Sequence, residues 1–259
     1  MNVSRVLAIA NNAFREVVRD RILYIIGFYA VILLLSLNLL PEIAAATEDK
    51  IFLDLGLAVM SLLSLIVAVF VGTGLINKEI EKRTILMLIA KPIGKNEFII
   101  GKYLGLSAVL ALLVAAMTAI YLILLQLNNI SYSAISIAIN AIFLILQLSL
   151  ISAIAITFGV FTGSILATAL TFAVYLMGNI TQDLLQLARI SENPGLERIT
   201  QALYLLLPDL SRLILKNEAV YGLSALPDST TLFLNAGYTL FYSAMLLAFA
   251  ILMFSRKEF

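Results

Sequence analysis

The fold is decided by a charged stretch that lies between two uncharged ones. Residues Asn77–Lys102 read NKEIEKRTILMLIAKPIGKNEFIIGK. They are flanked by Leu55–Ile76 and Tyr103–Leu127, neither of which contains Asp, Glu, Lys or Arg. As helices, both flanking runs are long enough to cross the roughly 30 Å hydrocarbon layer of a bilayer. The sequence therefore predicts a loop that joins two membrane-spanning helices.

The composition of the whole chain also indicates an integral membrane protein. Of its 259 residues, 62% are hydrophobic and 13% are charged, whereas soluble domains contain about 25% charged residues. Tyr103–Gln182 has no charged residue, and as one straight helix it would be about 120 Å long. Because that length is several times the thickness of the hydrocarbon layer, this run must fold back on itself. The formal net charge of +1 gives no indication of nucleic acid binding.

The sequence predicts an all-α polytopic membrane protein, with one domain over residues 1–259. Charges, prolines and clusters of small polar residues divide it into six spans. The predicted spans are residues 22–40, 55–76, 103–127, 134–158, 165–182 and 229–254. Glycines and alanines at four-residue spacing predict close helix contacts. They are Gly101 with Gly105, and the series Ala155, Gly159, Gly163 and Ala167.

Residues 1–21 have the pattern of an amphipathic helix. At 100° per residue, the apolar side chains fall on one side and most polar ones on the other, with Ile9 as the one apolar exception. Glu16 and Asp20 argue against a secretory signal, which needs an uninterrupted apolar stretch there. We therefore expect this segment to lie on the membrane surface.

The segment 183–228 is the one long region that the pattern places outside the membrane. Leu196–Leu215 is apolar, but it contains four charged residues and Pro208, so its insertion into the bilayer is unfavourable. We expect an amphipathic helix that starts at Pro194 with Asn193 as its N-cap. After Pro208-Asp209, a second amphipathic helix is expected. It would run through Leu210, Leu213 and Ile214.

The distribution of basic residues predicts the orientation. With both termini in the cytoplasm, twelve Lys and Arg lie inside and five lie outside. The positive-inside rule then places Asn77–Lys102 in the cytoplasm. We expect a multi-pass protein of the plasma or inner membrane.

Several kinds of chemistry are excluded by residues that the chain lacks. It has no His and no Cys, so imidazole relays, Cys or Ser–His nucleophiles and thiolate metal sites cannot form within it. The predicted spans contain no ionisable Asp, Glu, Lys or Arg, which ion-coupled carriers usually need. Asn140 and Gln147 lie on one face of the fourth span. They would either bond neighbouring helices or line a polar path for a substrate.

The motifs of the charged stretch resemble the cytoplasmic loop of ABC type-2 permeases, the membrane subunits of ABC exporters. The resemblance rests on Glu79–Thr84, on Ala90-Lys91-Pro92-Ile93 and on Glu97–Lys102, and the order of elements matches over the whole chain. Two positions depart from the family pattern. No Gly separates Arg83 from Thr84, and Gly94 stands where Ser usually caps the next helix, although Glu97 keeps the reciprocal capping position.

The resemblance implies a permease subunit without its own catalysis. A coupling helix in this loop would contact the ABC ATPase subunit, and two ATPases would work with two permease copies or close relatives. ATP and Mg would bind in the partner, so this chain would hold no cofactor. The contact residues would be Glu79, Glu81, Arg83, Thr84, Leu86, Met87, Lys91 and Pro92. The paired helices before the sixth span would cap the exit.

Two other interpretations remain open at this point. The charged stretch could be a basic loop with a short amphipathic turn against the lipid headgroups. The chain could also be an ion-coupled secondary transporter or a channel-like protein. An uncharged interior would suit lipidic, amphipathic or neutral cargo better than a small ion.

Overall fold

The computed structural model describes residues 2–43, 47–81, 94–191 and 194–256, and within these ranges the chain forms helices and no strands. The α-helices are α1 (Val3–Val17), α2 (Leu23–Ile43), α3 (Glu48–Glu81), α5 (Lys95–Leu127), α6 (Ala134–Phe161), α7 (Ser164–Ile190), α8 (Pro194–Leu206), α9 (Lys216–Tyr221) and α10 (Ser229–Arg256). The π-helical turn Val18–Ile22 and the 3-10 turns Ser211–Leu213 and Leu223–Ala225 lie between them. The all-α prediction is confirmed.

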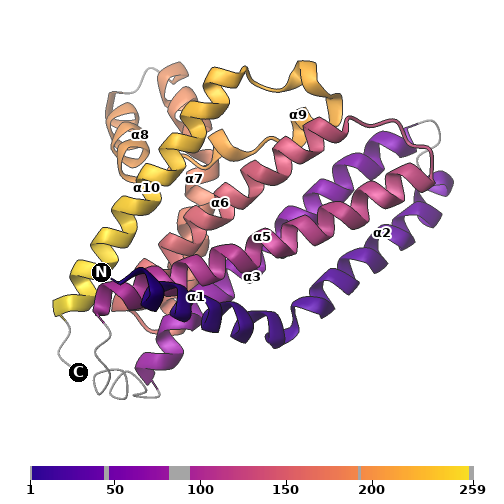
Figure 1. Cartoon of the computed structure of the whole chain (residues 1–259). Coiled ribbons are helices and arrows are strands. Elements are labelled where there is room, and N and C mark those ends of the chain that lie inside the picture. The colour runs from indigo at the N-terminus through magenta and orange to yellow at the C-terminus, as the bar shows by residue number, and fades with distance from the viewer. Residues whose placement is uncertain (1, 44–46, 82–93, 192–193, 257–259) are drawn as a thin grey trace.

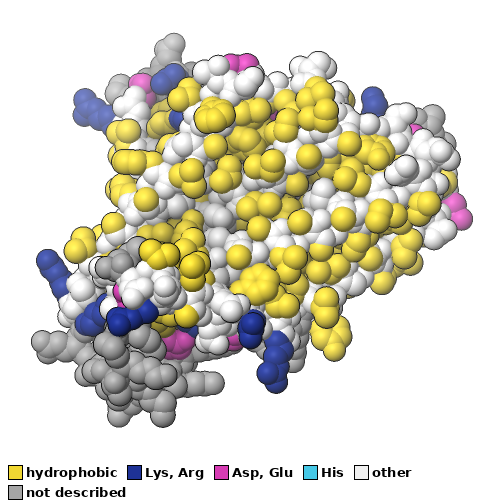
Figure 2. All heavy atoms as spheres, in the orientation of Figure 1, with side chains coloured by type: hydrophobic (Ala, Val, Ile, Leu, Met, Phe, Trp, Pro, Cys, Tyr) yellow, Lys and Arg dark blue, Asp and Glu magenta, His cyan; other side chains and the backbone are white. Residues whose placement is uncertain are grey.

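Six of these helices are long and apolar enough to cross a membrane, which is the number that the sequence predicts. They are α2, α3, α5, α6, α7 and α10. Figure 2 shows apolar side chains spread over the middle of the visible face, with Lys and Arg gathered toward its two ends. This distribution suits a protein whose middle contacts lipid and whose ends contact water.

Helix α6 occupies the centre of the bundle (Figure 1), where it packs against α3, α5, α7 and α10. In its most apolar stretch 72% of the residues are buried, against 11% in α2. Small residues allow the close approach. A methyl group added at Gly72 of α3 would lie 2.8 Å from the Cβ of Ala155 on α6.

Each of the six long helices in the described part of the chain extends beyond its predicted span at one end or both, because a helix need not end where the apolar run does. Helix α2 continues through Pro41 to Ile43, since a proline in the last turn removes only one hydrogen bond. Helix α3 begins at Glu48 instead of Leu55, and the carboxylates of Glu48 and Asp49 favour a helix N-terminus. Helix α7 continues past Gln182 to Ile190.

The region before the last span differs from the prediction in its second helix. Helix α8 begins at Pro194 as predicted, while its expected cap, Asn193, lies outside the described residues. Instead of a helix through Leu210 and Leu213, the chain forms a 3-10 turn at Ser211–Leu213 and then α9. The Asp209 carboxylate accepts hydrogen bonds from Ser211 and Arg212, and such local bonds favour a turn over a continued helix.

The N-terminal helix packs against the bundle. At Gly105 of α5, an added methyl would lie 2.6 Å from the carbonyl oxygen of Ala10 and 2.7 Å from the Cβ of Ala13. A methyl group added at Gly101 would lie 2.7 Å from the Cβ of Ile9, so Ile9 faces α5, which explains the one apolar residue on the polar side of α1. The predicted contact role is therefore confirmed for Gly101 and Gly105. It is wrong for Gly163, where an added methyl would meet no described atom within 4 Å and which instead occupies the N-cap position of α7.

Both described chain ends lie at the same end of the bundle, together with the start of α5 (Figure 1). The backbone N–H of Asn2 donates to Glu97 at 2.6 Å, and Lys95 donates to the carbonyl oxygen of Ser255 at 3.1 Å. Phe98 of α5 also stacks on Phe254 of α10. Helices α1, α5 and α10 therefore meet at the start of α5, which follows the predicted contact loop in the sequence.

Candidate functional site

The structure describes the two ends of the predicted ATPase-contact segment and leaves its middle undescribed. Six of the predicted contact residues lie outside the described residues: Arg83, Thr84, Leu86, Met87, Lys91 and Pro92. For Glu81, the last residue of α3, only the backbone is described. Glu79 is described in full. The described part of the site therefore consists of Glu79 and the start of α5.

Glu79 forms an ion pair with Lys102, a buried cation of α5. The Lys102 side chain is 3% exposed, and its Nζ lies 2.5 Å from Oε1 of Glu79 and 3.4 Å from Oε2 of Glu16. The ammonium also lies 5.8 Å from the centre of the Phe98 ring. Glu16 belongs to α1 and Glu79 to α3. We call Glu16, Glu79 and Lys102 the Lys102 junction, because this one lysine joins three helices.

Glu97 forms a second connection one turn before Lys102 on α5. Its Oε2 accepts the backbone N–H of Gly94 at 3.3 Å, which confirms the predicted reciprocal capping position. Its Oε1 accepts the N–H of Asn2, and Arg5 lies 3.9 Å from Oε2. The start of α5 is therefore held to the start of α1.

Together these contacts form a frame where α3 ends and α5 begins. Helix α3 ends two residues after Glu79, α5 starts directly after Gly94, and both positions are connected to α1 through α5 side chains. An ion pair that is largely removed from water is costly to break, because it leaves an uncompensated charge behind. The end of α3 and the start of α5 are therefore held to α1 and to each other.

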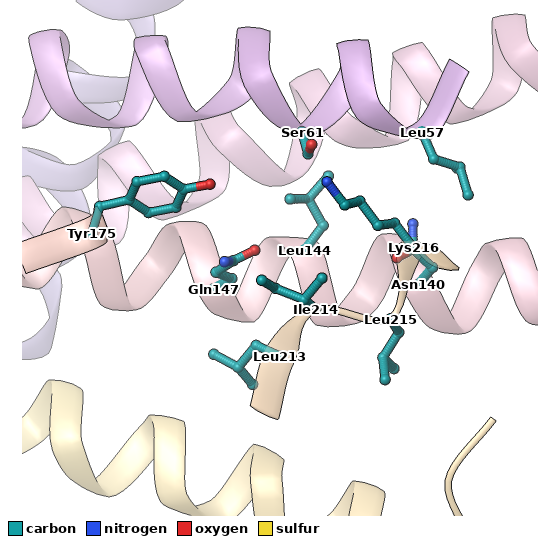
Figure 3. Close-up of a pocket in the computed structure, with 10 residues that line it drawn as sticks. All are labelled: Leu57, Ser61, Asn140, Leu144, Gln147, Tyr175, Leu213, Ile214, Leu215 and Lys216. Atoms are coloured by element: carbon teal, nitrogen blue, oxygen red, sulfur yellow. The ribbon is translucent and has the colours of Figure 1, made fainter. Parts of the chain in front are cut away.

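Asn140 and Gln147 lie together in the other predicted site, a cavity between α3, α6, α7 and the segment before α9 (Figure 3). Ser61, Tyr175 and Lys216 also line it, and the remaining lining residues are Leu and Ile. The cavity volume that the centres of water molecules can occupy is about 30 Å³. This is enough for about two water molecules. The interior was expected to be uncharged, but Lys216 brings a charge into it.

A comparison with protein families assigns the chain. The model of the family described as "ABC-2 family transporter protein" matches residues 7–259. The chain belongs to the ABC-2 transporter family. The match includes all six membrane-spanning helices and the loop between α3 and α5. A search of curated proteins gave no match.

Membership of the ABC-2 family agrees with the resemblance seen in the sequence and makes the chain a membrane component of a transporter. Within the described residues, no group of three or more His, Cys, Asp and Glu side chains could hold a metal ion. The two sites described above are a charged connection between helices and a polar cavity.

This ABC-2 protein has a second buried charged group at the opposite end of the bundle. Asp209 is 3% exposed, and its carboxylate accepts hydrogen bonds from Gln182 at 2.6 Å, Ser211 at 2.6 Å and Arg212 at 2.8 Å. Tyr238 of α10 accepts the N–H of Asp209 at 2.9 Å, and its ring lies 5.2 Å from the Arg212 guanidinium. We call these five residues the Asp209 cluster.

The charge of Asp209 is stabilised by its hydrogen bonds. Burial alone raises the pKa of Asp209, but the bonds from Ser211, Arg212 and Gln182 outweigh that effect and hold the pKa below its ordinary value. In the same way, the hydrogen bond to Asp209 raises the pKa of Arg212. The cluster therefore ties α7, α10 and the segment after α8 together as an ionised unit.

Sequence reasoning missed the partners of both buried charges and the lysine of the cavity. Lys102 gives a signal, because a charge at the edge of an uncharged run needs a partner. Which carboxylates supply it depends on the packing of α1. Lys216 gave no such signal, since it lies in a segment that was expected outside the membrane.

Proposed function

We propose that this chain is the permease subunit of an ATP-driven exporter and that it couples to a separate ABC ATPase subunit through the loop between α3 and α5. The family match supports the transport role. The observation that carries the coupling is the Lys102 junction, because it connects the loop to α1, α3 and α5 at once.

In this proposal the ATPase subunit binds ATP and Mg, and the chain itself performs no catalysis. Two ATPase subunits work with two permease copies or with a permease and a close relative. When the ATPase pair closes on ATP, it displaces Thr84–Ala90 and with it the frame at the ends of the loop. The apolar side chains of that segment are the docking surface.

The orientation in the proposal follows the basic residues. Both termini and the loop face the cytoplasm of the plasma or inner membrane, as the excess of Lys and Arg at that end favours. The start of α5 contacts both ends of the chain, through Glu97 with Asn2 and through Lys95 with Ser255. These contacts support the same side of the membrane for both termini and the loop. The polar side chains of Asn140 and Gln147 belong to the path of the cargo, and α8, α9 and the Asp209 cluster cover its exit.

The proposal is tested by Met87→Asp and Leu86→Asp. Either change would place an unpaired charge in an apolar contact and cost about 2–5 kcal/mol of association. We expect normal insertion into the membrane and loss of the co-purified ATPase subunit. Leu223→Asp is the matched control, since Leu223 is an exposed apolar residue just after α9, and α9 lies at the other end of the bundle (Figure 1). Retention of the ATPase subunit by Met87→Asp at the level of Leu223→Asp would contradict the coupling role.

A further inference from the structure

The cavity between α3, α6 and α7 contains two buried amides that lack hydrogen-bond partners. Asn140 and Gln147 are each 6% exposed, and neither side chain makes a hydrogen bond with a described residue. Their amide groups point into the cavity in Figure 3. Buried amides in folded proteins are almost always hydrogen-bonded, to protein, water or ligand. The cavity is therefore shaped for a polar occupant.

Lys216 determines the sign of the charge that such an occupant should carry. Its side chain extends from the start of α9 into the middle of the lining residues, toward Ser61 (Figure 3). In the part of the chain that the structure describes, no Asp or Glu oxygen lies within 4.0 Å of its ammonium. An ammonium surrounded by hydroxyl and amide groups attracts anionic oxygen and repels cations.

The nearest carboxylate along the chain does not change this conclusion. Glu218 also lies on α9, and its Oε2 is buried without a hydrogen-bond partner. It forms no ion pair with Lys216 and does not line the cavity. The charge presented to the cavity is therefore that of Lys216.

The other half of the lining is apolar, which indicates what the anionic group should be attached to. Leu57, Leu144, Leu213, Ile214 and Leu215 complete the wall. Room for about two water molecules is close to the space of one carboxylate or phosphate group and far below that of a whole lipid. An apolar body would have to continue from the cavity along the neighbouring helices.

We propose that this cavity binds the anionic oxygen headgroup, phosphate or carboxylate, of an amphipathic molecule. Lys216 supplies the opposite charge, and the amides of Asn140 and Gln147 donate hydrogen bonds to the headgroup oxygens. The proposal rests on the cargo path proposed above, whose residues Asn140 and Gln147 it uses, and names the class of molecule that binds there. It is independent of the coupling role, because the site needs no ATPase subunit to bind its ligand.

The test uses the purified permease alone, in a neutral detergent. Native mass spectrometry would measure the binding of dihexanoyl phosphatidic acid, of dihexanoylglycerol, which lacks the phosphate, and of inorganic phosphate, which lacks the apolar body. We expect saturable binding of one phosphatidic acid per chain, at least tenfold tighter than inorganic phosphate and absent for dihexanoylglycerol. Equal affinity for inorganic phosphate and phosphatidic acid would overturn the proposal that the ligand is amphipathic.

Variants of the lining residues separate a built site from general lipid adhesion. Lys216→Gln should weaken the binding of phosphatidic acid at least tenfold. The affinity of Lys216→Arg should stay within about threefold of wild type, because arginine keeps the charge. Asn140→Leu and Gln147→Leu should each weaken it severalfold. Lys50→Gln is the control, since Lys50 lies near α9 over the Tyr221 ring and does not line the cavity.

The unfolding temperature without ligand shows that each variant is folded. Unchanged binding by Lys216→Gln, or an equal loss in Lys50→Gln, would overturn the site. Because the ATPase subunit is absent, that result would leave the coupling proposal standing, and a failure of the Met87→Asp test would leave this one standing.

Discussion

The Lys102 junction and the Asp209 cluster both bury one charged side chain, but they draw its partners from different places. Lys102 is paired with carboxylates of two other helices, α1 and α3. Asp209 is paired mainly within its own segment, since Ser211 and Arg212 follow it by two and three residues. The junction is therefore a long-range connection, and the cluster is largely a local one.

The two sites also differ in how completely the charge is satisfied. The Asp209 carboxylate has three donors and a pKa held below its ordinary value. Lys102 shares one positive charge between two carboxylates, and Glu16, one of the two, is 49% exposed. The cluster is suited to keep one shape. The junction is suited to transmit a displacement, because a movement of any one of three helices changes its pairing.

The largest expected effect is that of Lys102→Met. Removing the buried cation breaks the ion pairs of Lys102 with Glu79 and Glu16, and with them the ionic connection of α5 to α3 and α1, at a cost of about 3–5 kcal/mol. We expect a clearly lower unfolding temperature in detergent, with substantial rescue by Lys102→Arg. An unfolding temperature equal to that of wild type would mean that the junction does not stabilise the bundle.

Asp209→Asn should be less costly, because the local hydrogen bonds are partly kept. We expect a loss of about 1–3 kcal/mol at pH 7. Since the pKa of Asp209 is depressed in the folded protein, its charge adds stability above the unfolded-state pKa, and this stability is lost as the pH falls through the folded pKa. The difference in unfolding temperature between wild type and variant should therefore shrink between pH 7 and about pH 3. A constant difference would contradict the stabilised charge.

The Asp209 cluster and the Lys102 junction each lie near a glycine at which two segments of backbone approach closely. Replacing that glycine with alanine compares the packing of the two regions directly. At Gly178, an added methyl would lie 2.6 Å from the carbonyl oxygen of Pro208, as it would from that of Ala10 at Gly105. Gly178→Ala and Gly105→Ala should each lower the free energy of unfolding by about 1–3 kcal/mol. Gly237→Ala is the control, because its added methyl would meet no described atom within 4 Å and it gains up to about 1 kcal/mol of helix propensity. A similar gain in all three, seen in thermal unfolding, would exclude these close contacts.

Glu16→Gln should have the smallest effect. Glu16 is half exposed and lies farther from Lys102 than Glu79 does, so we expect a loss of about 0.2–1 kcal/mol. Thermal unfolding of Glu16→Gln and of Glu79→Gln, measured side by side, compares the losses of stability in the two variants. If Glu16→Gln were the more costly of the two, α1 and not α3 would be the main partner of the lysine.

The sequence predicts the number of spans because uncharged runs of this length can lie only in a bilayer. It also predicts features that depend on a few neighbouring residues, such as the cap at Gly94 with Glu97 and the contact surface at Gly101 and Gly105. The helix ends were less predictable, since α3 and α7 continue beyond the apolar runs, and the apolar pattern gives no signal for these extensions.

The candidate sites were predictable only in part. The spacing of Asn140 and Gln147 placed them on one face of α6, and the structure brings them into one cavity. Lys216 joins them because the Asp209 cluster turns the chain back toward the bundle. That turn depends on Gln182 and Tyr238, which lie in other helices, so no local pattern reveals it.

The central claim is that the Lys102 junction transmits the movement of the ATPase subunit to the bundle. The chain has no Cys, so a spin label can be placed at Leu223→Cys alone, and the distance between the labels of two permease copies can be measured by pulsed EPR. With an intact junction, we predict that ATP changes this distance. In Lys102→Met, the ATPase subunit should remain bound and the distance should no longer respond to ATP. The same ATP-dependent change in Lys102→Met would contradict the account.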